Sequence, residues 1–295
     1  MIKKTIEKNR TLKPNHAQMA VLREHFSGCF DRDGNFDMRK FQAELADKVD
    51  FKKESYGLEF LGKNYARYLY NIETETVIVP DIKHNNKAEN KHSENIYITA
   101  DNLDALKHLE KSYSNSIMCI YVDPPYNTGS DGFSYSDKFN FTKEQLAEKL
   151  DVSIDEAERI LGFSKRGSNS HSAWLTFMYP RLKIAQRLLS SDGVMFISID
   201  DNQQANLKLL CDEIFGEGNV EQLIWRKTDM TDGVMKITHR FRVEHEYVLA
   251  VYKNKSNVFF NKVMSLSRVK GKYPNPDKDY RGDWISCELG RSDEK

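Results

Sequence analysis

The sequence predicts an α/β fold, in which helices cover an open sheet. Two observations lead to this prediction. From about residue 94, short apolar runs alternate with longer helical segments, which is the pattern of strands and helices that follow one another along the chain. The apolar run Ile117–Val122 also lacks polar alternation, as is typical of a strand covered on both faces. With 295 residues, the chain is long enough for one large domain or two average ones.

Residues 1–93 are expected to form a helical N-terminal region and a linker. The region is rich in charged residues, and its apolar residues are spaced loosely, as on the faces of helices. The polar stretch His84–His92 has few apolar residues and therefore predicts a flexible loop. We interpret its histidines and lysines as parts of this solvated loop, because such residues form a metal site far less often.

The α/β region is expected to span residues 94–253. Its strands are predicted at 95–99, 116–122, 194–199, 221–225 and 245–252. Its helices are predicted at 103–109, 172–189 and 203–215, and a charged helical insertion ends near residue 166. Asn102 or Asp101 would cap the first of these helices. Because a long loop separates the last two strands, they should pair as an antiparallel hairpin at the edge of the sheet.

Composition excludes several classes of protein. Lys and Arg together number 44, as do Asp and Glu, so no net basic charge indicates a polyanionic partner, and DNA contacts must be argued locally. No GxGxxG or GxxxxGK[ST] loop is present, which argues against a nucleotide-hydrolysing subunit. No apolar run approaches the length of a membrane span. The cysteines lack CxxC spacing, which argues against zinc and disulfides and for a reducing, cytoplasmic location; they are Cys29, Cys119, Cys211 and Cys287.

The residues that follow the strand 116–122 indicate the chemistry. They are Asp123, Pro124, Pro125 and Tyr126. Two consecutive prolines end the strand and fix its backbone, so the Asp123 carboxylate and the Pro124 carbonyl can form a rigid pair of acceptors. Such a pair suits an exocyclic amino group, which has two N–H bonds, and the Tyr126 ring suits the stacking of a base. The run therefore predicts a site for a nucleobase amine, against the alternative of a plain turn with a solvated Asp and a packed Tyr.

This run, continued by Asn127-Thr128-Gly129, resembles the motif of the amino-directed DNA methyltransferases, written Asp/Asn/Ser-Pro-Pro-Tyr/Phe. It is most similar to the motif of the adenine-N6 enzymes, in particular the modification (Mod) subunits of type III restriction-modification systems. The resemblance implies that S-adenosylmethionine methylates adenine N6 on a base extruded from double-stranded DNA, with the four residues of the run as catalytic residues. It also implies a Rossmann-like methyltransferase sheet of strand order 3-2-1-4-5-7-6, a Mod homodimer, a restriction (Res) subunit as partner, and no membrane.

Two acids at strand ends are candidates for contacts with the cofactor. In related methyltransferases, an acidic or polar residue at the end of the preceding strand lies near the cofactor adenine, which implies this role for Asp101. A helix N-cap is an equally good interpretation of Asp101, and both can hold at once. Asp200 follows the strand 194–199, and it either lies near the cofactor or caps the next helix. This chemistry requires no metal.

The helix that begins near His171 also resembles the family, where it packs beside the active strand. His171 and Ser172 could suggest a hydrolase, but adjacent Ser and His residues rarely form a catalytic pair, and no GxSxG motif is present. We therefore reject that interpretation. Trp174, Phe177 and Leu182 are expected to be core residues.

DNA contacts are expected from basic residues near the predicted hairpin, namely Arg226, Lys227, Lys236 and Arg240. Such side chains could contact phosphates and hold the duplex in place. A solvated charged face is an equally good interpretation. Residues 254–295 are expected to begin a target-recognition region, and the run Asn275–Trp284 resembles the family's Asp-x-Arg-Gly-x-Trp region. The resemblance thus covers about residues 94–290.

One departure from the family pattern is serious. In this permuted class, a cofactor-binding Phe-x-Gly-x-Gly loop follows the target-recognition region, and nothing in the sequence matches it. The sequence supplies strands 3 to 7 but not 1 and 2, which would leave the edge of the active strand unpaired. We therefore expect an incomplete sheet in an N-terminal fragment, either a truncated gene product or half of a split enzyme, with weak or no cofactor binding alone.

Two alternative functions stay open. The first is methylation of cytosine N4, which the leading Asp of the motif makes less favoured because those enzymes usually carry Ser there. The second is a non-catalytic module for DNA binding or assembly, which is favoured if the missing half is never supplied by another chain.

Overall fold

A computed structural model describes residues 2–45, 57–129, 141–164, 170–227 and 243–261, and the structural statements below concern these residues. By its internal contacts, the chain divides into two units, Met1–Val258 and Phe259–Lys295. All the helices and strands below belong to the first unit. The α/β fold class that the sequence predicts is confirmed.

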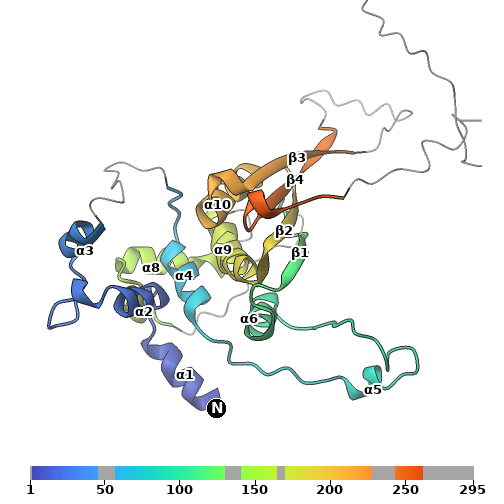
Figure 1. Cartoon of the computed structure of the whole chain (residues 1–295). Coiled ribbons are helices and arrows are strands. Elements are labelled where there is room, and N and C mark those ends of the chain that lie inside the picture. Colours follow the sequence, from blue (N-terminus) through green and yellow to red (C-terminus); the bar gives the residue numbers. More distant parts are fainter. Residues whose placement is uncertain (1, 46–56, 130–140, 165–169, 228–242, 262–295) are drawn as a thin grey trace, which may run out of the picture. The chain divides into compact units, whose positions relative to one another are not determined.

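A four-stranded mixed sheet forms the framework of the first unit (Figure 1). Its strands are β1 (Ile117–Val122), β2 (Leu189–Ile199), β3 (Val220–Arg226) and β4 (His245–Tyr252), in the order β1-β2-β4-β3. β1 runs parallel to β2, whereas β4 is antiparallel to both β2 and β3. The predicted hairpin is thus confirmed, because β3 pairs with β4 along its whole length. The observed order corresponds to strands 4-5-7-6 of the sheet that the resemblance predicts.

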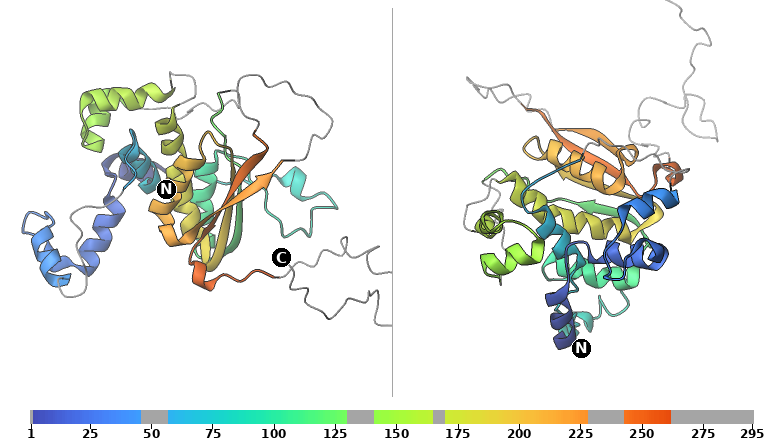
Figure 2. Two further views of the ribbon diagram at one scale, coloured as in Figure 1. Left: turned by 90° about the horizontal axis from the view of Figure 1, so that it is seen from above. Right: turned by 90° about the vertical axis from the view of Figure 1, so that its left-hand side faces the viewer.

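Helices α9 (His171–Leu188) and α10 (Gln204–Phe215) pack against one face of this sheet (Figure 2). Every second residue of β2 points toward them, and Met195, Ile197 and Ile199 are fully buried in the core that they share. The observed helices begin and end within one residue of the predicted 172–189 and 203–215. The core therefore lies between β2, β4 and these two helices.

The opposite face of the sheet is open along β1. Tyr121 is 67% exposed and Met118 is 68% exposed, so the expectation that this strand is buried on both faces is wrong. Farther across the same face, Val194, Ala250 and Tyr252 form only a small buried cluster. The apolar sequence of β1 makes its burial favourable. Whether its second face is buried depends on other elements of the protein, which the sequence of the strand does not determine.

The strand predicted at 95–99 is also wrong. These residues have no regular secondary structure and belong to no sheet among the described residues, and Tyr97 is 92% exposed. A strand needs a neighbour for its backbone N–H and C=O groups, and an alternating sequence does not supply one. β1 is consequently the edge strand of the described sheet, next to β2 alone.

Helices precede the sheet, as the sequence predicts. They are α1 (Ile2–Thr11), α2 (His16–His25), α3 (Met38–Leu45), α4 (Lys63–Asn71), the short α5 (Ile82–Asn85) and α6 (Asn102–Tyr113). The charged insertion forms α7 (Lys143–Leu150) and α8 (Ile154–Leu161). None of the helices in the described ranges has both the length and the apolar character that a membrane span requires.

A second core joins helices from both sides of the linker. Tyr65 and Tyr68 of α4 are buried with Leu103 of α6, Leu146 of α7 and Ile160 of α8. α4 and α6 also pack against α9, which therefore contributes to both cores. The division of the chain at residues 93 and 253 into three regions stays a prediction.

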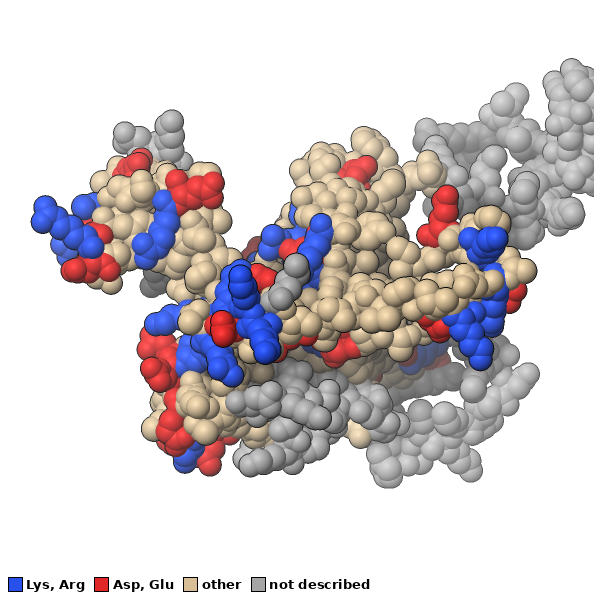
Figure 3. All heavy atoms as spheres, turned by 90° about the horizontal axis from the view of Figure 1, so that it is seen from below, with Lys and Arg blue, Asp and Glu red and all other residues tan. Residues whose placement is uncertain are grey.

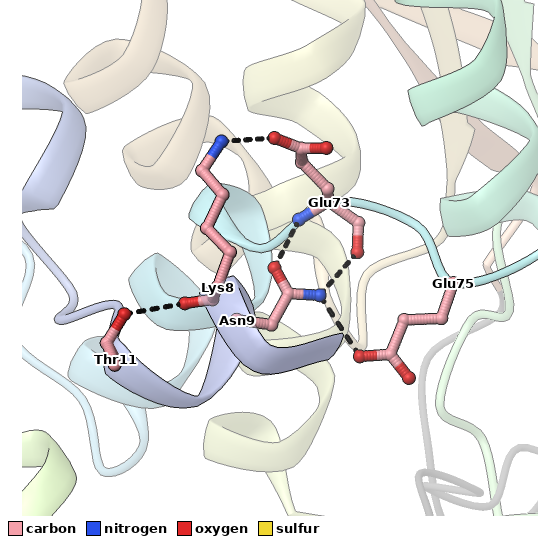
Figure 4. A network of polar contacts seen from close by, with 5 residues as sticks. All are labelled: Lys8, Asn9, Thr11, Glu73 and Glu75. Atoms are coloured by element: carbon pink, nitrogen blue, oxygen red, sulfur yellow. Dashed lines mark hydrogen bonds and ion pairs between the residues drawn. The ribbon is translucent and has the colours of Figure 1, made fainter. Parts of the chain in front are cut away.

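Hydrogen bonds connect α1 to the segment that follows α4 (Figure 4). The side-chain amide of the buried Asn9 donates to the Glu73 carbonyl oxygen at 2.9 Å and to a Glu75 carboxylate oxygen at 3.1 Å. Its amide oxygen accepts from the Glu73 backbone N–H at 3.0 Å, and Lys8 adds an ion pair with the Glu73 carboxylate. One asparagine thus holds two segments together that lie more than sixty residues apart in sequence.

Candidate active site at the end of strand β1

The run predicted to carry the chemistry lies where β1 leaves the sheet. β1 and β2 are parallel, with Val122 opposite Ile197, so Asp123 and Asp200, which follow the two strands, emerge at the same edge. The Asp123 side chain is exposed, whereas Pro124 is buried. The carboxylate is therefore presented at the sheet edge by a backbone that packs against the protein.

The second proline of the run is held by α9. The indole N–H of Trp174 donates a hydrogen bond of 2.6 Å to the carbonyl oxygen of Pro125. Trp174 is fully buried, as the sequence predicts for a core residue, so its only polar atom is satisfied by the site loop. Sequence reasoning missed this bond, because the bond depends on how the helix and the loop pack together and not on a motif.

Tyr126 lies partly buried against the main core. Burial raises the pKa of its phenol above the ordinary value, and the negative charge of Asp123 and a hydrogen bond to that carboxylate raise the pKa further. The phenol is therefore protonated at neutral pH and donates to Asp123. In this structure, the Asp123 and Tyr126 side chains, which would face a base, are hydrogen-bonded to each other.

Two residues with left-handed backbone follow the run. Asn127 is buried and adopts a left-handed backbone conformation, with φ of 58°. Asn tolerates this conformation better than most residues. Gly129, with φ of 81°, adopts a similar conformation without strain because glycine has no side chain. The Asn-Thr-Gly sequence thus places two left-handed residues within three positions of Tyr126.

Asp101, the first candidate for a cofactor contact, caps α6. Its carboxylate accepts from the Leu103 backbone N–H at 2.8 Å, which confirms the interpretation of Asp101 as an N-cap. The buried Arg181 of α9 lies 3.6 Å from the same carboxylate and donates to the Asn102 side chain at 2.6 Å. This end of α6 is thus fixed to α9, and the cofactor role of Asp101 stays a prediction.

Asp200, the second candidate, is engaged in a local turn. Its carboxylate accepts from the backbone N–H of Asn202 at 3.0 Å and from the Asn202 side chain at 2.7 Å. Next to this turn, the ring Nδ1 of His171 lies 2.9 Å from the buried Gln203 amide and 3.1 Å from the Asn206 amide. This amide and imidazole network connects the first turns of α9 and α10, and sequence reasoning missed it.

The described residues that could contact S-adenosylmethionine are the carboxylates of Asp101 and Asp200. Each carboxylate accepts a hydrogen bond from neighbouring backbone and keeps further lone pairs for a ligand. The sheet edge beside β1 carries no further strand in the described part of the chain. Within that part, no group of three or more His, Cys, Asp or Glu side chains is arranged to hold a metal ion.

The basic residues proposed for DNA contacts lie partly within the described structure. Arg226 ends β3 and Lys227 follows it, both exposed, and the Lys227 ammonium pairs with the Glu246 carboxylate at 2.6 Å. Lys236 and Arg240 lie outside the described residues. On the face drawn in Figure 3, Lys and Arg side chains lie among Asp and Glu side chains, so charge alone does not identify a DNA surface.

Comparison with known proteins gives clear relatives. A family model described as "DNA methylase" matches residues 117–292. The EcoP15I Mod subunit of a type III restriction-modification enzyme from Escherichia coli is 45% identical over 93% of this chain and 42% of its own length. The EcoPI Mod subunit of Escherichia phage P1 is also 45% identical, over 94% of this chain and 41% of its own length. The StyLTI Mod subunit of Salmonella typhimurium is 38% identical over 98% of this chain and 46% of its own length.

The chain therefore spans less than half the length of these relatives. Among solved structures, the M1.HpyAVI complex with SAM is 15% identical, with a TM-score of 0.32 over 57% of this chain and 59% of that one. The cytosine-N4-specific PvuII methyltransferase is 14% identical, with a TM-score of 0.31 over 56% of this chain and 57% of that one. Structural likeness at this level carries no argument about function.

Proposed function

Because the chain belongs to the DNA methylase family, we propose that it forms the target-base side of a DNA methyltransferase that acts on the N6 amino group of adenine. The observation that carries the proposal is the run Asp123, Pro124, Pro125 and Tyr126 at the carboxyl end of β1. This edge of an open α/β sheet is where such folds bind their ligands.

The proposed chemistry of the run concerns the amino group. Asp123 and the Pro124 carbonyl would each accept one N–H of adenine N6, which turns the nitrogen lone pair out of the ring system and makes it a better nucleophile. The base must leave the duplex to reach this site, and the Tyr126 ring would stack against it. S-adenosylmethionine would supply the methyl group.

The similarity to Mod subunits supports a wider proposal about the protein to which this sequence belongs. We propose that it is the modification subunit of a type III restriction-modification system, with double-stranded DNA as substrate and with a second Mod copy and a Res subunit as partners. Its expected location is the cytoplasm. Arg226 and Lys227 would contact DNA phosphates at the end of the β3–β4 hairpin, and Lys236 and Arg240 are proposed for the same role on sequence alone.

The test compares adenine with purine, which lacks the 6-amino group. Titration of the 295-residue chain, followed by NMR, should show that adenine binds about tenfold more tightly than purine or better, because hydrogen bonds to charged groups contribute about 1.5–3 kcal/mol. In Asp123→Ala, this preference should fall by about tenfold while the chain keeps its fold. A preference for cytosine over adenine would instead favour N4 methylation, and no preference for any amino base would contradict the proposal.

A further inference from the structure

The bond between Trp174 and Pro125 controls the one easily rotated torsion between the Pro124 carbonyl and the Tyr126 backbone. The proline rings fix φ at Pro124 and Pro125, and the peptide bond between these residues is planar. Between the Pro124 carbonyl and the Tyr126 backbone, only ψ of Pro125 can rotate easily. The Pro125 carbonyl moves with that torsion, and it is this oxygen that the Trp174 indole holds at 2.6 Å.

Trp174 is itself rigidly placed. It lies in the first turn of α9, where the Ser170 hydroxyl accepts from the Ala173 backbone N–H at 3.3 Å, and the Trp174 backbone N–H donates to the Ser170 carbonyl at 3.0 Å. The same turn is fixed to α10, because His171 lies 2.9 Å from the fully buried Gln203. Because its helix turn is fixed in this way, the Trp174 indole can hold the Pro125 carbonyl in one orientation.

We propose that Trp174 is a positioning residue of the candidate site: by fixing ψ of Pro125, its indole N–H holds the Pro124 carbonyl and the Tyr126 backbone, which carries the ring, in the relative orientation that an exocyclic amine and its base require. This inference rests on the proposed function, since it assigns to Trp174 the alignment of the two groups that would contact the base. A tryptophan that only fills the core would contribute to stability and leave base recognition unchanged.

Trp174→Phe separates these two roles, because phenylalanine keeps an aromatic ring in the core and removes the N–H donor. Trp225→Phe is the matched control, since Trp225 lies on β3 and is 64% exposed. In titrations with adenine and purine, the preference for adenine should fall about three- to tenfold in Trp174→Phe, as expected for one misaligned hydrogen bond, and should stay unchanged in Trp225→Phe. A variant that keeps the full preference would overturn the positioning role.

NMR measurements test the same role without any ligand. In the unaltered chain, the Trp174 indole N–H should exchange with solvent far more slowly than that of Trp225, and exchange at equal rates would overturn the inference. With labelled tyrosine, the Tyr126 ring signals should shift and broaden in Trp174→Phe and stay in place in Trp225→Phe. Unchanged Tyr126 signals in a folded Trp174→Phe would also overturn it.

These outcomes keep the two proposals apart. If the unaltered chain shows no preference for adenine over purine, the proposed function fails, and the Tyr126 signals and indole exchange alone decide whether Trp174 orients the loop. If the unaltered chain prefers adenine and Trp174→Phe does so equally, the positioning role fails and the proposed function stands.

Discussion

The hydroxyl of Tyr126 is hydrogen-bonded to the carboxylate of Asp123 at the carboxyl end of β1. The raised pKa of the phenol makes it the donor in this bond over the neutral pH range. An amino group that reaches Asp123 must therefore share the carboxylate with the phenol or displace it. When no base is present, the phenol donates to the Asp123 carboxylate, which would otherwise bind water.

Removal of that hydroxyl should strengthen the binding of an amino base. Tyr126→Phe keeps the stacking ring and frees the Asp123 carboxylate, so adenine should bind about tenfold more tightly, since a hydrogen bond to a charged group contributes about 1.5–3 kcal/mol. Titration with adenine and with purine measures the effect, and purine binding should change little. Weaker binding of adenine by Tyr126→Phe would show that the hydroxyl contacts the base directly.

The 295-residue chain should bind S-adenosylmethionine weakly or not at all on its own. The reason is that β1 has a neighbouring strand on one side only in the described structure, so no second strand end borders the crevice beside Asp123 on that side. Isothermal titration calorimetry measures this affinity. Tight, saturable binding with one site per chain would contradict the expectation.

Loss of the Asn9 side chain should loosen α1. Its amide makes three hydrogen bonds with Glu73 and Glu75 in a buried position, and Asn9→Ala removes all three. The free energy of unfolding should fall by about 1–3 kcal/mol in urea denaturation. Thr11→Ala is the matched control, because the Thr11 hydroxyl makes only an exposed bond to the Lys8 carbonyl, and it should change stability far less. Equal effects of the two substitutions would contradict the role of Asn9.

Lys183 of α9 should make stability depend on pH in the alkaline range. Burial lowers its pKa below 10.5, Glu213 opposes this shift, and Arg67 adds to it. Between the lowered pKa and 10.5, the folded chain has lost this proton and the unfolded chain still binds it, so this group makes stability rise with pH. Below that window, the folded chain carries the full desolvation cost of the charge.

Lys183→Met removes this contribution while it keeps the length of the side chain. The variant should be more stable than the unaltered chain at pH 7, and its advantage should shrink as pH approaches 10.5. Urea denaturation of both chains from neutral pH to about pH 10 gives the difference. An advantage that stays constant or grows with pH would show that the Lys183 pKa is not lowered in the folded chain.

The sequence predicted those parts of the fold whose signals are local. Ser170 caps α9 two residues before the predicted start of this helix at residue 172, and Asp101 caps α6 as the Asp-Asn-Leu sequence indicates. The β3–β4 hairpin follows from two apolar runs that come one after the other in the sequence. In each case, neighbouring residues in the chain determine the structure.

The predictions from sequence were wrong where contacts between distant segments of the chain determine the structure. Ile96 and Tyr97 have the composition of a strand, but no strand pairs with them in the described structure. Tyr121 is exposed because the described elements leave its face of β1 uncovered. The bond of Trp174 to Pro125 likewise depends on how a helix meets a loop forty-nine residues earlier in the chain. Sequence identified the run at the end of β1, and only the packing revealed what orients it.

The most direct test of the central claim observes the amino group itself. Adenine labelled with nitrogen-15 at N6 should show both amino-proton signals shifted downfield and slowed in exchange when it binds the unaltered chain, because Asp123 and the Pro124 carbonyl each accept one N–H. In Asp123→Ala, the signal of the proton that faced the carboxylate should return toward its value in water. Identical amino-proton signals in the two chains would contradict the claim that this run holds the target amine.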